Sequence, residues 1–207
     1  MKNKSDIKVM LKEAGILFAI TLIAGFVLGF VYELTKEPIR LQKEMAVRNA
    51  CAEVFADASD FQEIAYTPDA RVATELANRG IKIGTVYEAQ GASGEGMGYV
   101  IQSTSTEGYG GNIVLYAGVT KEGILNDISI LDISETPGLG MKAEDELVPQ
   151  FHQQPVTWFV YTKNGSTSEG EIDAISGATV TTSAVTNAVN GTMLVYEDIM
   201  RGGGGNE

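Results

Sequence analysis

The sequence predicts an α+β protein, with one N-terminal transmembrane helix followed by a domain in which helices flank an antiparallel sheet. Three observations lead to this prediction. Residues 14–32 form an uncharged apolar stretch, residues 81–133 contain short runs rich in Val, Ile and Tyr that Gly separates, and residues 181–200 return to helical spacing. A chain of 207 residues leaves room for one ordinary domain beyond the membrane segment.

The apolar stretch at residues 14–32 has the length of a membrane span. At about 1.5 Å per residue it would cover about 28 Å, close to the hydrocarbon core of a bilayer. Lys8 and Lys12 precede it and Tyr32 closes it, as expected where a helix meets the membrane surface. A cleaved signal peptide usually has a shorter apolar run and a small-residue cleavage site, which Tyr-Glu-Leu-Thr-Lys does not provide. We therefore predict an anchor behind a tail of residues 1–13; a signal peptide or a buried soluble helix is the alternative.

The charge pattern divides the chain into two parts. Residues 1–50 carry eight basic and five acidic side chains, whereas the remainder carries seven basic and 22 acidic ones. Such an acidic remainder argues against a nucleic-acid partner, which needs clustered Lys and Arg. The lysines before the span and the basic residues after it are nearly balanced, so the positive-inside rule hardly decides the orientation. Our preference is a short N-terminal tail on one side and the large acidic domain on the other.

The remaining elements follow from local patterns. We expect a helical connector over residues 33–80, including a helix from Leu41 to Phe55 that Pro38 starts or kinks and in which Cys51 is a small apolar residue. Residues 81–201 would form the main domain and residues 202–207 a floppy tail. The predicted strands are Ile81–Ala89, Met97–Gln102, Ile113–Val119, Ile124–Ile133 and one around Thr157–Tyr161, with a turn at Asn164-Gly165. The final helix, Thr181–Met200, would bury Val185, Ala188, Val189, Thr192, Met193, Tyr196 and Ile199.

Composition removes several classes of site. One Cys and one His exclude a disulfide framework, a Cys-based zinc site and an HExxH metal site, so we expect no metal ligands. A hydrolase would depend on His152, which has no nucleophile-elbow pattern near it. The glycines of Gly91–Gly98 lie between two predicted strands, so a hairpin loop is a better interpretation than a nucleotide-binding loop.

Two segments contain residues typical of a ligand-binding site. The first, Asp173–Ser183, joins a strand-like run to the last helix and contains small residues and many hydroxyls. Small residues let a bulky group approach the backbone, and a helix start favours an anion, although a simple Ser/Thr N-cap has the same pattern. The second, Ser134–Lys142, contains Pro137-Gly138, which suits a type II turn at a strand end where ligand contacts are common.

These segments resemble a known family. Asp-x-x-Ser-Gly-Ala-Thr at 173–179 resembles the flavinylation motif of proteins that carry FMN joined through its phosphate to threonine, and SETPGLG at 134–140 and GYGG at 108–111 resemble the FMN-binding domain of that family. With the anchor and this length, the chain is similar to the RnfG family, the flavin-carrying components of Rnf ion-translocating electron transport complexes. NqrC, the corresponding component of the sodium-pumping NADH:quinone reductase, has a similar motif and layout and is the close alternative.

The resemblance implies a role for several residues. Thr179 would be the acceptor of the FMN phosphate, with Ser176, Gly177, Ala178 and Thr182 beside it. Thr136, Leu139 and Gly140 would lie against the flavin, and Lys142 could balance charge on the reduced ring, although an ordinary surface lysine fits it equally well. A flavin transferase would read Asp173 and Ser176–Ala178 as its target. No side chain of this chain would be catalytic, because the cofactor does the redox work.

The resemblance also implies a place in the cell. The N-terminus would be cytoplasmic and the FMN domain extracytoplasmic, in a cell-membrane complex whose other members couple ferredoxin:NAD⁺ oxidoreduction to Na⁺ or H⁺ movement. The isolated chain would carry electrons without turnover. A non-redox anchored binding module, which keeps the 173–183 loop as a helix cap, is the alternative from a different class. Tyr109 and Trp158 could stack near a flavin, but we expect both to pack in the core.

Overall fold

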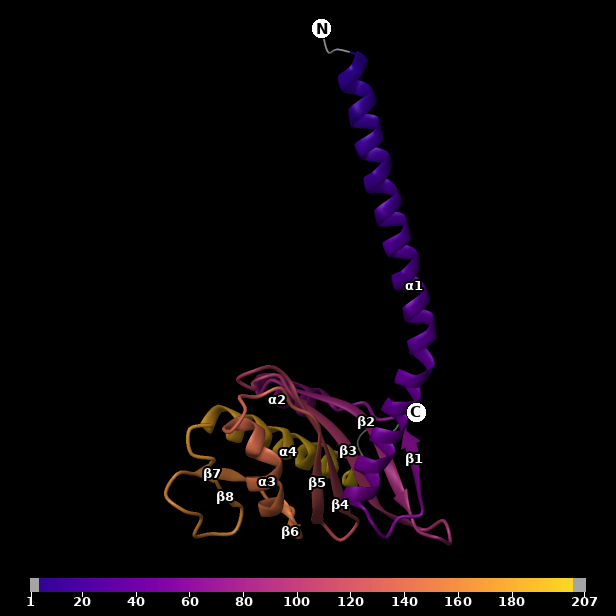
Figure 1. Ribbon diagram of the computed structural model, residues 1–207. Helices are drawn as coiled ribbons and strands as arrows, with labels where there is room; N and C mark the ends of the chain where they lie inside the picture. The colour runs from indigo at the N-terminus through magenta and orange to yellow at the C-terminus, as the bar shows by residue number, and fades with distance from the viewer. Residues whose placement is uncertain (1–3, 203–207) are drawn as a thin grey trace. The chain divides into compact units, whose positions relative to one another are not determined.

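The structure is a computed structural model that describes the backbone of residues 4–202 and the side chains from Ile7 onward (Figure 1). The predicted tails at residues 1–13 and 202–207 therefore lie partly outside the described residues. The chain divides into two compact units, residues 1–46 and 47–207. Each unit is described by itself.

The first unit is a single helical segment, the larger part of α1 (Lys4–Val54). This helix contains the predicted span and is long and apolar enough to cross a membrane. Its apolar side chains are exposed, Phe26 to 75% and Leu28 to 70%. Exposed apolar side chains along a whole helix are typical of a membrane span. Pro38 neither starts nor ends it, since the helix continues through that residue.

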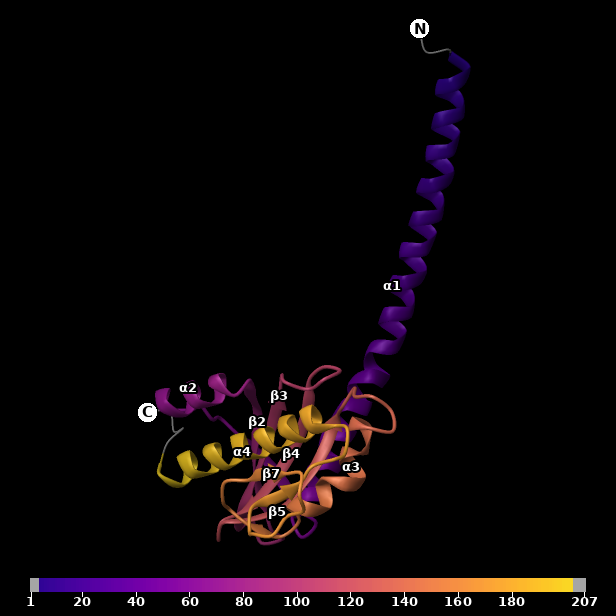
Figure 2. The ribbon, with the colours of Figure 1, turned by 90° about the vertical axis from the view of Figure 1, so that its left-hand side faces the viewer.

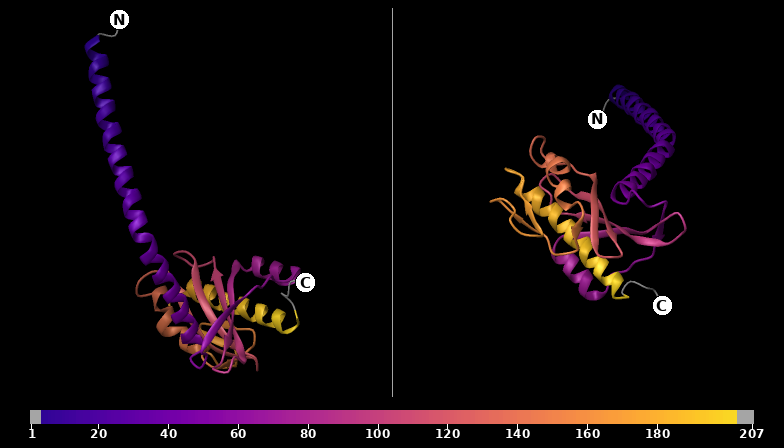
Figure 3. Two further views of the ribbon diagram at one scale, coloured as in Figure 1. Left: turned by 90° about the vertical axis from the view of Figure 1, so that its right-hand side faces the viewer. Right: turned by 90° about the horizontal axis from the view of Figure 1, so that it is seen from below.

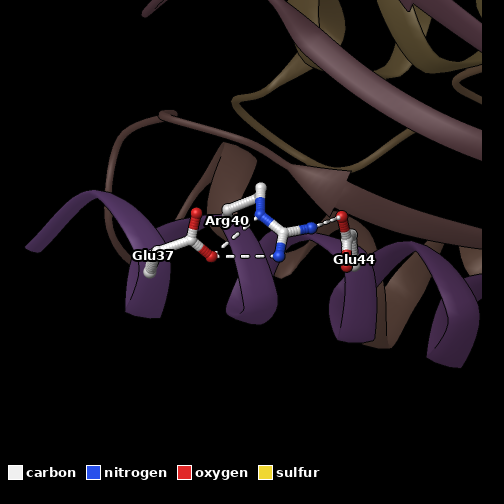
Figure 4. Close-up of polar contacts among 3 residues, drawn as sticks. All are labelled: Glu37, Arg40 and Glu44. Atoms are coloured by element: carbon white, nitrogen blue, oxygen red, sulfur yellow. Dashed lines mark hydrogen bonds and ion pairs between the residues drawn. The ribbon is translucent and has the colours of Figure 1, made fainter.

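Beyond the apolar part, α1 gains support from charged pairs on its own surface. Arg40 donates to Glu37 at 3.0 Å and to Glu44 at 2.5 Å, one turn before and one turn after it (Figure 4). Exposed pairs at this spacing each stabilise a helix by about 0.2–0.5 kcal/mol. The pairs thus help the helix to continue where apolar side chains become sparse.

The second unit is built on a six-stranded antiparallel sheet with strand order β1-β2-β3-β4-β5-β6. The predicted strands from Ile81 to Ile133 are confirmed as β2–β5. The strands are β1 (Asp60–Ile64), β2 (Ile81–Gln90), β3 (Gly96–Ser105), β4 (Ile113–Thr120), β5 (Ile124–Asp132) and β6 (Gln154–Pro155). The glycine-rich segment after β2 is the predicted hairpin loop, with Gly94 at a φ of 83°.

Helices cover both faces of this sheet. Successive strand residues point to opposite faces, so Ile101 packs against α4 (Thr179–Met200) while Val100 packs against the last turns of α1. Helix α2 (Ala70–Asn78) lies on the same face as α4 (Figure 2), and the end of α1 lies on the other (Figure 3, left). Cys51 lies between the end of α1 and the sheet and is 1% exposed. Burial raises the pKa of its thiol to about 11, and the prediction of an apolar role is confirmed.

Two expectations about the chain's organisation need correction. Residues 33–80 are not helical throughout, because β1 and α2 follow α1 and β1 adds an edge strand to the sheet. The segment at 157–161 is mostly irregular: β7 (Val160–Thr162) pairs in parallel with β8 (Glu171–Asp173) instead of forming a hairpin around Asn164-Gly165. The buried amide of Asn190 on α4 accepts from Phe159 N and donates to Phe159 O, at 2.9 and 2.8 Å, so the Phe159 backbone pairs with this side chain and not with a strand.

Helix α4 is largely buried in the domain. It begins two residues earlier than predicted and ends at the predicted residue. The predicted inner face is confirmed, with Ile199 partly buried and the other six residues buried. Its N-terminal end emerges from the core beside the segment between β5 and α3 (Ala143–Glu146), where the candidate site is found.

Candidate functional site

The structure brings the three motif segments together around one pocket of about 490 Å³. That volume is within the usual range for small-molecule and cofactor sites. The pocket is lined by Tyr109, Glu135, Thr136, Leu139, Gly140, Gly177, Ala178, Thr179, Val180 and Thr181. Six of the predicted site residues, Thr136, Leu139, Gly140, Gly177, Ala178 and Thr179, are thus neighbours in space although some 40 residues of sequence separate the two motifs.

One wall of the pocket is the predicted tight turn. Leu139 N donates to Thr136 O at 3.1 Å and Gly138 has a φ of 75°, as the Pro137-Gly138 turn requires. The turn leads into the short helix η1 (Gly140–Lys142). It leaves the Leu139 side chain 40% exposed, so this wall presents an apolar surface to the pocket.

A second wall is the loop that precedes α4. Ala178 N donates to Ile175 O at 3.0 Å, which closes a turn around Gly177, whose φ is 79°. A Cβ at Gly177 would also lie 3.2 Å from Leu139 Cδ2. The glycine therefore lets the two walls approach each other at this point.

The first turn of α4 faces the pocket without a side-chain cap. Its N-cap is Ala178, and within the part of the chain that the structure describes no side chain accepts a capping hydrogen bond from the N–H groups of this helix end. The first N–H groups of a helix have no partner inside the helix, and with the helix dipole they favour an anion. Thr179 is the first residue of α4 and is only partly buried, so its hydroxyl lies at this electropositive end.

The other hydroxyls near the helix start are used within the protein. Thr182 is fully buried: its Oγ1 donates to Ala178 O at 3.0 Å and accepts from Ile175 N at 3.2 Å. Thr181 Oγ1 donates to Glu135 Oε2 at 3.0 Å. The simple hydroxyl cap considered from the sequence is therefore not the arrangement found, and Thr182 is not brought to the pocket.

Three other predicted residues also lie away from the pocket lining. Lys142 is exposed and its Nζ pairs with Glu146 at 3.1 Å. Ser176 is exposed on the loop, and Asp173 is exposed at the end of β8, where its Oδ1 accepts from Ser166 N. The Gln150 side chain donates to Asp173 O and accepts from Asp173 N. These two hydrogen bonds fix this part of the motif at the protein surface.

The sequence prediction failed for several residues of the region. Tyr109 does not pack in the core: it is 75% exposed and lines the pocket. Trp158 is 40% exposed, away from the pocket, with the Arg79 guanidinium 4.4 Å from the centre of its ring. Glu135 and Thr181 line the pocket although the sequence did not predict them as site residues. The location of Glu135 inside the SETPGLG segment was the one signal for it, while Thr181 resembled any helix-start hydroxyl.

Two family models match this chain. The family model of the FMN-binding domain matches residues 108–193, and that of the RnfG N-terminal region matches residues 1–54. The chain is thus a protein with an FMN-binding domain that follows an apolar N-terminal helix in the sequence.

Relatives extend the match to nearly the whole chain. The G subunit of the Na⁺-translocating ferredoxin:NAD⁺ oxidoreductase complex of Acetobacterium woodii is 31% identical over 97% of this chain and 98% of its own. The G subunit of the proton-translocating complex of Clostridium ljungdahlii is 32% identical over 86% of this chain and 90% of its own, and that of the Methanosarcina acetivorans ion-translocating complex 30% over 90% and 94%. The chain belongs to the RnfG family, the G subunits of ion-translocating oxidoreductase complexes.

A solved structure was also found. NqrC of Shewanella oneidensis matches with a TM-score of 0.48 and 18% identity, over 72% of each chain.

Proposed function

We propose that this chain is a membrane-anchored electron carrier that holds FMN covalently, through a phosphodiester between the flavin phosphate and Thr179 Oγ1. The observation that carries the proposal is the joining of both motif segments around one pocket, with Thr179 at an uncapped helix start. When bound, the flavin supplies the redox chemistry by accepting and releasing electrons.

The residues present fit such a group. Leu139 and Val180 are exposed apolar side chains and Tyr109 is an exposed aromatic one, so together they offer a surface suited to a flavin ring. Gly177 is exposed and adds no side chain to the pocket wall, so the backbone there stays accessible. These residues would hold the cofactor and shield it partly from water.

The charge of the attached group also fits the helix start. A phosphodiester retains about one negative charge, and free N–H groups at the start of α4 can stabilise it without a basic side chain. That is consistent with the described residues that line the pocket, which include no Lys or Arg. Thr179 would thus be both the covalent attachment point and the entry to an anion site.

We further propose the surroundings of this protein. Residues 14–32 would anchor it in the cell membrane with the N-terminus cytoplasmic and the FMN domain extracytoplasmic. Its partners would be the other subunits of an Rnf-type complex that couples ferredoxin:NAD⁺ oxidoreduction to Na⁺ or H⁺ translocation, in line with the names of the relatives. The isolated chain would show no turnover, because the electron donor and acceptor belong to other subunits.

Attachment would need a flavin transferase. The segment that it would read consists of Asp173 and Ser176–Ala178. Asp173, Ser176 and Gly177 are exposed, whereas the Ala178 side chain is buried. The fixed position of Asp173 at the end of β8 would present this segment in one conformation before the flavin arrives.

The test is attachment of flavin to the full-length chain. The chain is expressed with and without a flavin transferase, and flavin fluorescence is read from the band on a denaturing gel. We expect fluorescence only with the transferase, and its complete loss in Thr179→Ala. Thr74→Ala, which removes an exposed hydroxyl from the first turns of α2, is the matched control and should keep the fluorescence.

Two results would contradict the proposal. A dark wild-type band, while the same transferase labels a control substrate, would support the non-redox binding module. A fluorescent Thr179→Ala band would place the attachment on another residue.

A further inference from the structure

The pocket contains a buried carboxylate that the proposed chemistry does not use. Glu135 is 7% exposed, and both of its oxygens are engaged with the protein. Its Oε1 accepts from Gly110 N at 3.2 Å and its Oε2 accepts from Thr181 Oγ1 at 3.0 Å. One side chain therefore joins the segment after β3, the segment after β5 and the first turn of α4.

The backbone around Glu135 is shaped for this side chain. A Cβ at Gly140 would lie 2.7 Å from Glu135 Cβ, and one at Gly108 would lie 2.8 Å from Glu135 Oε1. Both distances are too short for real side chains. Glycine at position 140 thus leaves the space that the Glu135 side chain occupies. At position 108 a Cβ would lie still closer to Gly111 O, so the backbone also requires that glycine.

The joined segments carry the two sides of the pocket. Gly110 directly follows Tyr109, the exposed aromatic wall, and Thr181 is two residues from Thr179 on α4. The Tyr109 segment has no regular secondary structure between β3 and β4, so it needs a contact to fix its position. Glu135 supplies such a contact: it accepts from Gly110 N and also from Thr181 Oγ1, in the same helix turn as Thr179.

We propose that Glu135 is a positioning residue, whose two hydrogen bonds hold the Tyr109 segment at a fixed place relative to the Thr179 hydroxyl. This inference rests on the proposed function for its consequence, which is the orientation of the attached flavin. The hydrogen bonds exist without the flavin, so the positioning itself can be tested in the unloaded protein.

The first experiment therefore uses unloaded full-length chain in detergent. Hydrogen–deuterium exchange of the peptide that contains Gly108–Gly111 is compared between wild type, Glu135→Ala and Glu135→Gln. The alanine should accelerate this exchange, because Gly110 N–H loses its acceptor. The glutamine should stay close to wild type, since its Oε1 can accept from Gly110 and its Nε2 can donate to Thr181 Oγ1. Glu144→Ala, an exposed carboxylate on α3, is the matched control.

The second experiment uses the chain loaded by the transferase. We expect Glu135→Ala to lower the initial rate of flavin attachment by about tenfold, because displaced reacting groups lose rate steeply, and to change the visible circular dichroism of the bound flavin. Glu135→Gln should restore both. If the alanine variant does not fold, Thr181→Val removes one of the two bonds and should change the same signals in the same direction.

The outcomes separate the two proposals. Unchanged exchange in Glu135→Ala, or a glutamine variant as altered as the alanine, overturns the positioning role. A dark wild-type band overturns the proposed function alone, and the exchange measurement then still decides on Glu135.

Discussion

Helices α2 and α4 lie on the same face of the sheet but begin in different ways. Asp69 caps α2, with its Oδ1 accepting from Val72 N at 2.6 Å. At α4 the N-cap is Ala178, and within the described residues no side chain takes the capping position despite four hydroxyls in the first turns. The start of α2 is capped by the Asp69 side chain, whereas the start of α4, which lies at the pocket, has no side-chain cap.

The difference lies in what the hydroxyls of α4 do. Thr182 joins the helix to the preceding loop and Thr181 binds Glu135, so both stabilise the shape of the site. Thr179 is left at the pocket. A series of substitutions can therefore separate the residues that hold the helix start from those that would contact a ligand.

Thr182→Val should have the largest effect on stability. It removes a buried hydroxyl and leaves the Ile175 N–H without its acceptor, which costs about 1–3 kcal/mol. Thermal unfolding monitored by circular dichroism should show a melting temperature several degrees lower, with flavin attachment retained in the folded protein. Thr74→Val is the exposed control. Full stability together with lost attachment would instead mean that Thr182 contacts FMN, as the resemblance implies.

Asp69→Ala should destabilise the other helix start by about 1 kcal/mol, the usual value of an N-cap. Denaturant unfolding would measure the loss, and Asp69→Asn should recover most of it because asparagine also caps. Flavin attachment should equal that of wild type. Reduced attachment in Asp69→Ala would show that the two helix starts are coupled, against the separation argued above.

The comparison also shows how far the sequence predicts the site. Periodicity is strong in α4 and in β2–β5, so these elements and the inner face of the helix were predicted correctly. The motifs SETPGLG and SGAT correctly predicted the two segments that form walls of the pocket. What the sequence could not give is the choice of partner for each polar group: Thr181, Thr182 and Ser176 look alike in the chain. Their roles differ because folding places one against Glu135, one under the loop and one in solvent.

The prediction that Tyr109 packs in the core was wrong for a related reason. An aromatic residue is usually buried, and only the fold shows that the segment between β3 and β4 turns this ring outward at the pocket. Because the ring is 75% exposed, Tyr109→Ala should change the free energy of unfolding by less than about 0.5 kcal/mol. It should nevertheless change the visible circular dichroism of the attached flavin, by removing an aromatic wall, while Tyr109→Phe should not. Unchanged spectra in the alanine variant would place the flavin away from Tyr109.

Lys142→Ala should have the smallest effect. Its ion pair with Glu146 is exposed, and such pairs contribute about 0–1 kcal/mol to stability. A lysine that balanced charge on the reduced flavin would raise the midpoint potential, and its loss would lower it. We expect no change in a redox titration of the loaded chain, with Lys163→Ala as the control, because Lys142 lies outside the pocket lining. A potential lowered only in Lys142→Ala would show that the ammonium group turns from Glu146 toward the flavin on reduction, and the helix start would then not be the sole source of positive charge at the site.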